Sequence, residues 1–256
     1  MPGGHAPQWL QRDVVMLISE LDGLDFAPEY PELLGRRVLI TGLSGALGLE
    51  IARAFGEARA RLVLQTSDAG PEAVVLGEIG TERAMDVKLF SGPIADHQAI
   101  LDFARTAIQS FGGIDAVINL AHVTEPPAGA TEAEIERHVT ELLSVPCLVT
   151  KVAANRMRTT LTQGSILNIV IVPRGASARS HQLGAIARAA LAGLTRTEAQ
   201  SAADAGIRVN AIAPGASFAE RGQQISSEPD VATLALHLAC SRGHQLSGLV
   251  FEACFG

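Results

Sequence analysis

Three glycines in the segment GLSGALG, residues 42–48, are the residues best placed to bind and act on a ligand. A short apolar run precedes the segment and a helical pattern follows it, so backbone N–H groups and the positive end of a helix dipole meet at the turn. The pattern predicts a cofactor-binding turn in which Gly42, Ser44, Gly45, Leu47 and Gly48 surround a pyrophosphate. The alternative is a glycine turn kept only for packing, because glycine geometry does not require a ligand.

Predicted strands and helices alternate around this turn. Glycines interrupt residues 69–85, which predicts an abbreviated helix there, and Gly206 predicts the end of a long alanine-rich helix. Strands are predicted at residues 37–41, 62–66, 165–172, 207–213 and 246–251, and helices from the turn to Phe55 and at residues 130–157, 182–205 and 228–240. Such alternation indicates an α/β fold with a parallel sheet.

Composition limits the classes of protein to which the chain can belong. The length of 256 residues suits one compact α/β domain, and 47% apolar with 18% charged residues is enough for a core and predicts subunit contacts. A net charge of −7 argues against nucleic acid as a partner. The three cysteines have no metal or disulfide spacing, which predicts a reducing compartment and no metal site. Without a membrane-length apolar run or a signal-peptide pattern, we expect a cytoplasmic protein.

The first 34 residues are predicted to be an extension of a domain that spans residues 35–256. Apolar residues recur at helical spacing between Gln8 and Leu24, which predicts an amphipathic helix. Its apolar stripe packs either on its own domain or on another subunit.

The stretch from Gly164 to Gly215 closely resembles the core of the short-chain dehydrogenase/reductases. The resemblance implies a Rossmann-type doubly wound parallel sheet of about seven strands and a bound NAD or NADP. Thr66 and Ser67 occupy the positions that distinguish the two cofactors, so neither is selected. The resemblance also implies that the pair Asp86 and Val87 lies beside the adenine and that Asn119 belongs to the cofactor site.

The positions of the family's catalytic residues hold other residue types in this chain. Aligned on the resemblance, its Asn, Ser, Tyr and Lys positions are occupied by Leu142, Ile171, Gly184 and Arg188. Leucine, isoleucine and glycine have no side-chain proton to give, and the pKa of arginine is too high for proton transfer. We therefore expect no catalytic residue at these positions, while Arg188 keeps a charge that suits a ribose.

Three further departures from the family pattern lie around the expected nicotinamide. His122 replaces a glycine that lets the cofactor lie close, and Ala219 replaces a threonine that binds the nicotinamide amide. Only residues 216–227 separate Gly215 from Glu228, so the helices that usually cover the substrate are largely deleted.

The sequence supports a preferred hypothesis and two alternatives. The preferred one is a catalytically silent relative that acts as a subunit, scaffold or NAD(P)-binding module, in a homo-oligomer (a dimer or tetramer) or paired with an active family member. The first alternative is an atypical NAD(P)-dependent oxidoreductase whose proton donor is His181, one helical turn before Gly184. The second is a sensor that binds NAD(P) without chemistry. A protein that binds no cofactor leaves only the scaffold.

Overall fold

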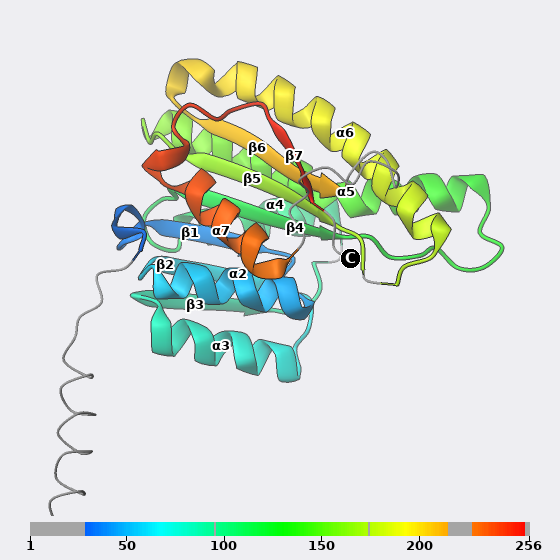
Figure 1. Ribbon diagram of the computed structural model, residues 1–256, viewed down its shortest axis with the longest axis horizontal. Coiled ribbons are helices and arrows are strands. Elements are labelled where there is room, and N and C mark those ends of the chain that lie inside the picture. The colour runs from blue at the N-terminus through cyan, green and yellow to red at the C-terminus, as the bar shows by residue number, and fades with distance from the viewer. Residues whose placement is uncertain (1–28, 95, 174, 215–226, 254–256) are drawn as a thin grey trace, which may run out of the picture.

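Seven parallel strands form one sheet in the order β3-β2-β1-β4-β5-β6-β7 (Figure 1). The computed structural model describes residues 29–94, 96–173, 175–214 and 227–253. The expected single-domain α/β fold of Rossmann type is confirmed. The strands are β1 (Arg37–Thr41), β2 (Arg61–Thr66), β3 (Asp86–Ser91), β4 (Ala116–His122), β5 (Ser165–Ile171), β6 (Arg208–Pro214) and β7 (Val250–Ala253).

Helices cover both faces of the sheet (Figure 1). Alternate residues of one strand face opposite helix layers: Val38 and Ile40 pack on one side, and Leu39 packs on the other. This burial on both faces explains why the strands are nearly continuous apolar runs. One layer contains α2 (Gly45–Glu57), α3 (Pro71–Arg83) and α7 (Glu228–Ala239), and the other contains α4 (His97–Gln109), α5 (Glu132–Thr159) and α6 (Ala178–Ala202).

The order of the strands reverses between β1 and β4, which are neighbours in the sheet. Thr41, the last residue of β1, is paired with Asn119 of β4. Ligands of open α/β sheets bind beyond the carboxyl ends of the strands at such a reversal. The glycine turn that follows β1 therefore stands where a cofactor is expected.

Helix α3 is not abbreviated, so this expectation was wrong. It runs for 13 residues, as do α2 and α4. A Cβ atom on its Gly80 would lie 2.5 Å from Cγ2 of Val87. The glycine that suggested an interruption instead allows the helix to pack directly on β3.

Two predicted boundaries differ from the observed ones because side chains bind the backbone there. Helix α6 begins at Ala178, earlier than predicted, because the hydroxyl of Ser177 accepts from the N–H of Ser180 at 3.3 Å. Strand β7 begins at Val250 rather than at residue 246. The side-chain amide of Asn210 binds the carbonyl of Leu246 at 2.8 Å and the N–H of Leu249 at 3.2 Å, so it takes the place of a strand ladder.

Helix α5 continues through Pro146, although a proline inside a helix is expected to kink it or to leave a carbonyl unpaired. The last turn after α6 is a short 3-10 helix, η2 (Ala203–Ala205), and Gly206 ends it with a φ of +67°, as predicted.

The predicted helix at residues 8–24 lies outside the described residues, and the division of the chain at residue 34 stays a prediction. The described part starts beside the end of α7, where Arg242 stacks on the ring of Tyr30 at 4.7 Å and binds Glu32 Oε1 at 3.1 Å. Leu33, in the short 3-10 helix η1 (Pro31–Leu33), is fully buried. Residues 29–34 therefore pack on the domain.

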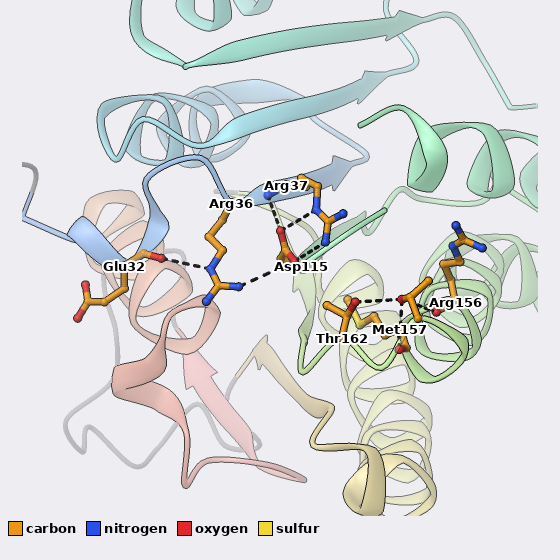
Figure 2. Close-up of polar contacts among 8 residues, drawn as sticks. Glu32, Arg36, Arg37, Asp115, Arg156, Met157 and Thr162 are labelled. Carbon is orange, nitrogen blue, oxygen red and sulfur yellow. Dashed lines mark hydrogen bonds and ion pairs between the residues drawn. The ribbon is translucent and has the colours of Figure 1, made fainter. Parts of the chain in front are cut away.

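An ion pair joins the amino ends of β1 and β4 (Figure 2). Arg37 binds Asp115 with its Nη2 at 2.7 Å and its Nε at 2.9 Å, and its backbone N–H donates at 2.9 Å. Burial by itself raises the pKa of Asp115, but these hydrogen bonds and the charges of Arg37 and Arg36 outweigh burial and lower it. The charged form of Asp115 is therefore stabilised by folding.

Replacing Asp115 by asparagine is expected to lower the free energy of unfolding at neutral pH by about 2–4 kcal/mol, since Arg37 loses its counter-ion. Because the pKa of Asp115 is lowered in the folded state, its contribution is complete above the unfolded value near 4 and disappears as the pH falls further. Urea titrations of both proteins between pH 7 and pH 2 should therefore converge at acidic pH. Asp102→Asn, at an exposed ion pair, is the control and should change little. A pH-independent difference would contradict this account.

Candidate functional site

Gly42 begins the turn after β1, and side chains of the protein bind both of its polar backbone groups. Its N–H donates to Oε1 of Gln65 at 2.8 Å, and its carbonyl lies 2.9 Å from Nε2 of His122. Because a carbonyl only accepts, Nε2 of His122 carries the proton. Burial lowers the pKa of His122, which keeps the ring neutral. The turn is thereby tied to the ends of β2 and β4.

The next amide that would face a phosphate is bound by a carboxylate of the protein itself. The N–H of Gly45, the first residue of α2, donates to Oε1 of Glu72 at 2.5 Å. Glu72 lies in the first turn of α3. Backbone N–H groups at the start of such a helix are the groups that bind phosphate oxygens in dinucleotide sites. Glu72 therefore occupies a position that suits an anion.

The other predicted residues of the turn have different surroundings. Ser44 precedes α2 with an extended backbone, and its side chain makes no capping hydrogen bond. Leu47 is buried in the core between α2 and the sheet. A Cβ atom on Gly48 would lie 3.3 Å from the backbone of Leu43, so this glycine serves close packing.

A small hollow of about 210 Å³ lies beside the turn. Small-molecule sites commonly measure about 300–1,000 Å³, so this hollow is small for a dinucleotide. In this arrangement a pyrophosphate would have to displace the carboxylate of Glu72 from the amide of Gly45. The lining of the hollow consists of Gly42, Gln65, Ser67, Ile94, Leu120, Ala121, His122, Leu142, Val145 and Pro146.

Asn119 makes hydrogen bonds inside the sheet, and its assignment to the cofactor site stays a prediction. Its side chain is fully buried between neighbouring strands, where it accepts from Thr41 Oγ1 at 2.8 Å and donates to Asn168 Oδ1 at 2.8 Å. Its amide is thus engaged inside the sheet and does not face the hollow beside the turn.

Asp86 and Val87 do not lie beside the glycine turn, so this placement was wrong. They are the first two residues of β3 and are paired with Arg61 and Leu62 at the start of β2. In a parallel sheet, the first residues of the strands lie at the edge opposite the turn. The Val87 side chain packs against Gly80 of α3. The family's Asp and apolar pair was expected at the carboxyl end of this strand, whereas Asp86 and Val87 lie at the amino end of β3.

The position assigned to the catalytic tyrosine is filled by neighbouring side chains. Gly184 is buried in α6, and a Cβ atom there would lie 2.6 Å from Cγ2 of Val172 and 3.6 Å from Cγ of Pro214. Ile171 is only 7% exposed, and Leu142 packs on the cluster that contains Val172. The surroundings of Gly184 are therefore apolar and closely packed.

Arg188 makes an ion pair with Glu252 of β7 rather than pointing at a free ribose position. Its guanidinium is thus engaged with the neighbouring strand, and the predicted contact with a ribose stays a prediction. His181 lies half-buried in the first turn of α6, and its N–H donates to the carbonyl of Ser177 at 3.1 Å. Ala219 lies outside the described residues.

Sequence reasoning missed several residues of the site, among them Gln65, Glu72 and Ile94. Gln65 had a signal, because it is a polar residue that directly follows the apolar run of residues 62–64 in β2 and is buried. Nothing in the sequence indicated Glu72, because its hydrogen bond to the amide of Gly45 depends on how α3 lies beside the turn. Ile94 follows the carboxyl end of β3, on the correct side of the sheet.

Other types of site find little support in the described residues. No three His, Cys, Asp or Glu side chains gather there in a way that would hold a metal ion. Among those same residues, no helix is long and apolar enough to cross a membrane.

The reversal between β1 and β4, with a glycine turn between β1 and α2, defines a Rossmann-type α/β protein of the dinucleotide-binding class. The family model for short chain dehydrogenases matches residues 36–230. The chain therefore belongs to the short chain dehydrogenase family, whose members generally bind NAD(P).

Curated relatives and solved structures agree with this family. The chain is 29% identical over 193 residues to glucose 1-dehydrogenase 2 of Bacillus subtilis (strain 168), and the match covers 73% of each chain. It is 30% identical over 179 residues to galactitol 2-dehydrogenase of Agrobacterium fabrum, over 69% of this chain and 68% of that one. A hydroxysteroid dehydrogenase from Escherichia coli superimposes with a TM-score of 0.71 at 25% identity, over 89% and 98% of the two chains.

Proposed function

We propose that this chain is a catalytically silent member of the short chain dehydrogenase family, which acts as a subunit or scaffold of an assembly. The observation that carries the proposal is the packing of Gly184 against Val172, which leaves no room for even a Cβ atom. A proton donor at this position would require either Val172 or α6 to shift.

The residue types around this position support the same proposal. Leu142 and Ile171 have no polar side-chain atoms, and the guanidinium of Arg188 is paired with Glu252. Positioned acid-base groups contribute roughly 10²- to 10⁴-fold to a reaction, and contacts to a developing oxyanion contribute a similar factor. Without either, reduction of a carbonyl group should be nearly abolished.

We further propose that dinucleotides bind weakly or not at all, because Glu72 holds the amide of Gly45. A negatively charged pyrophosphate must displace this carboxylate and then lie close to it. If binding does occur, the protein is a module that binds NAD(P) without chemistry. A preference for NAD or NADP has no support from Thr66 or Ser67.

The proposal places the protein in the cytoplasm, as a homo-oligomer or as a partner of an active family member. Its low charged fraction of 18% supports subunit contacts over part of the surface. Size-exclusion chromatography with light scattering, alone and after co-expression with an active relative encoded nearby, tests this assignment.

The purified protein is expected to show no turnover of NADH or NADPH with a panel of ketones and aldehydes, nor of NAD or NADP with alcohols and sugars. Calorimetric titration of the four nicotinamide forms should show weak binding or none. An active family member, assayed in parallel, is the control for the substrates. Turnover that disappears in His181→Ala would overturn the proposal in favour of an atypical oxidoreductase. Tight binding without turnover would favour the sensor.

A further inference from the structure

A hollow of about 1090 Å³ lies at the edge of the sheet opposite the glycine turn. The first residues of β1, β4 and β6 (Arg37, Ala116 and Arg208) contribute to its lining, which places it at the amino ends of the strands. Its lining contains four guanidinium groups, those of Arg36, Arg37, Arg196 and Arg208, but only one carboxylate, that of Asp115. The hollow is therefore basic in a chain whose net charge is −7.

The single carboxylate is already neutralised. Figure 2 shows Asp115 between Arg36 and Arg37, with Arg37 bound through two side-chain nitrogens. Arg36 reaches the same carboxylate only at 3.9 Å, and 53% of its side chain is exposed. Neither Arg196 nor Arg208 makes an ion pair with any described residue. Among the described residues, three guanidinium groups thus have no full counter-ion.

Arg208 is the partly buried member of this group. Its guanidinium donates to the carbonyls of Leu238, Gly243 and Cys240 at 2.7, 2.9 and 3.1 Å. These bonds satisfy donors but supply no negative charge, and burial lowers the pKa of Arg208. A partly buried charge without a counter-ion is costly, and an anion bound in the hollow would offset that cost.

The rest of the lining leaves room for an organic ligand. Small or apolar residues such as Gly164, Ala199 and Ile207 form parts of the wall, and Gln163 and Gln200 add polar side chains. The volume reaches the upper end of the range of about 300–1,000 Å³ for small-molecule sites. The hollow is thus large enough for a charged group together with an apolar body.

We propose that this hollow binds a small organic phosphate. A phosphate monoester has three terminal oxygens and nearly two negative charges, so it can accept hydrogen bonds from more than one of the guanidinium groups that line the hollow, whereas a carboxylate has two oxygens and one charge. The site is independent of the glycine turn, because the two lie at opposite edges of the sheet. It is therefore independent of the proposed function.

The test is a calorimetric titration with phenyl phosphate at fixed ionic strength, beside benzoate, which carries a carboxylate on the same ring. Phenyl phosphate is expected to bind at least about tenfold more tightly than benzoate, and Arg196→Ala to weaken its binding by about tenfold or more. Arg196 has no hydrogen bond to lose among the described residues, so the variant should fold normally. Arg36→Ala is expected to weaken binding in the same direction.

Arg137→Ala is the matched control, because Arg137 is an exposed arginine of α5 that does not line the hollow. Its affinity for phenyl phosphate should equal that of the unmodified protein. Three results would each overturn the proposal: no binding of phenyl phosphate, equal binding of phenyl phosphate and benzoate, or the same loss in Arg137→Ala as in Arg196→Ala. The last would indicate a diffuse effect of charge rather than a site.

Discussion

Replacing Gly42 by alanine is expected to lower the free energy of unfolding by more than about 4 kcal/mol, or to prevent folding. The Cβ atom would lie 2.1 Å from the backbone carbonyl oxygen of Leu120, which β4 holds in the centre of the sheet. The φ of +69° at Gly42 adds the strain of a left-handed conformation. Urea unfolding, or the soluble yield where the variant does not fold, measures the effect.

Gly45→Ala is the matched control for this substitution. Gly45 has nearly the same φ, +64°, but a Cβ atom there would have no neighbour within 4 Å. Only the backbone strain remains, so a loss of about 1–2 kcal/mol is expected. Similar losses in the two variants would show that strain, and not close approach to β4, explains the glycine at position 42. In that case the packing account of the turn fails.

Restoring the family's residues by Ile171→Ser, Gly184→Tyr and Arg188→Lys is expected to give no turnover and to lower stability by more than about 3 kcal/mol. The tyrosine ring has no space beside Val172, and the serine would place a hydroxyl in the apolar cluster that contains Ile171. Thermal unfolding and the reductase assay measure the two effects. Recovery of activity would show that the site is intact except for its chemical groups. It would contradict the proposal that Val172 fills the space beside Gly184.

Single alanine substitutions in α6 test the packing separately. In Gly193→Ala the new Cβ atom has no neighbour within 4 Å, so the substitution should stabilise the helix by about 0.5–1 kcal/mol. Gly184→Ala should instead destabilise the protein by about 1–3 kcal/mol, since its Cβ meets Val172. In a Val172→Ala background this loss should become smaller by about 1 kcal/mol or more. Equal losses of stability in the two backgrounds would show that contact with Val172 does not explain the glycine at position 184.

The predictions that depend on local pattern were the most accurate. The apolar runs predicted the bounds of β1, β2, β5 and β6 to within one residue, because a strand buried on both faces has a continuous apolar composition, whereas no bounds were predicted for β3 or β4. Gly206 was correctly predicted to end α6, since a positive φ there is a local requirement. The local pattern gave a wrong prediction for α3, because Gly80 does not interrupt the helix. Its missing side chain lets the helix pack on β3.

The candidate site was only partly predictable. The glycine turn was found from its sequence, but Asp86, Val87, Asn119 and Arg188 were assigned from resemblance and lie elsewhere or are engaged otherwise. A short motif does not specify which end of a strand carries it. The register of β2 and β3 decides that, and it depends on pairing across the sheet.

The amino-acid sequence by itself determined the α/β class, the alternation of strands and helices, the glycine turn and the absence of proton donors at Ile171 and Gly184, because each of these depends on residue type and short-range periodicity. Only the tertiary structure decided that Glu72 binds the amide of Gly45, that Val172 fills the space at Gly184, and that the arginines at the amino edge share one hollow. Such contacts join residues distant in the chain, so they depend on the packing of helices and strands and not on any single segment.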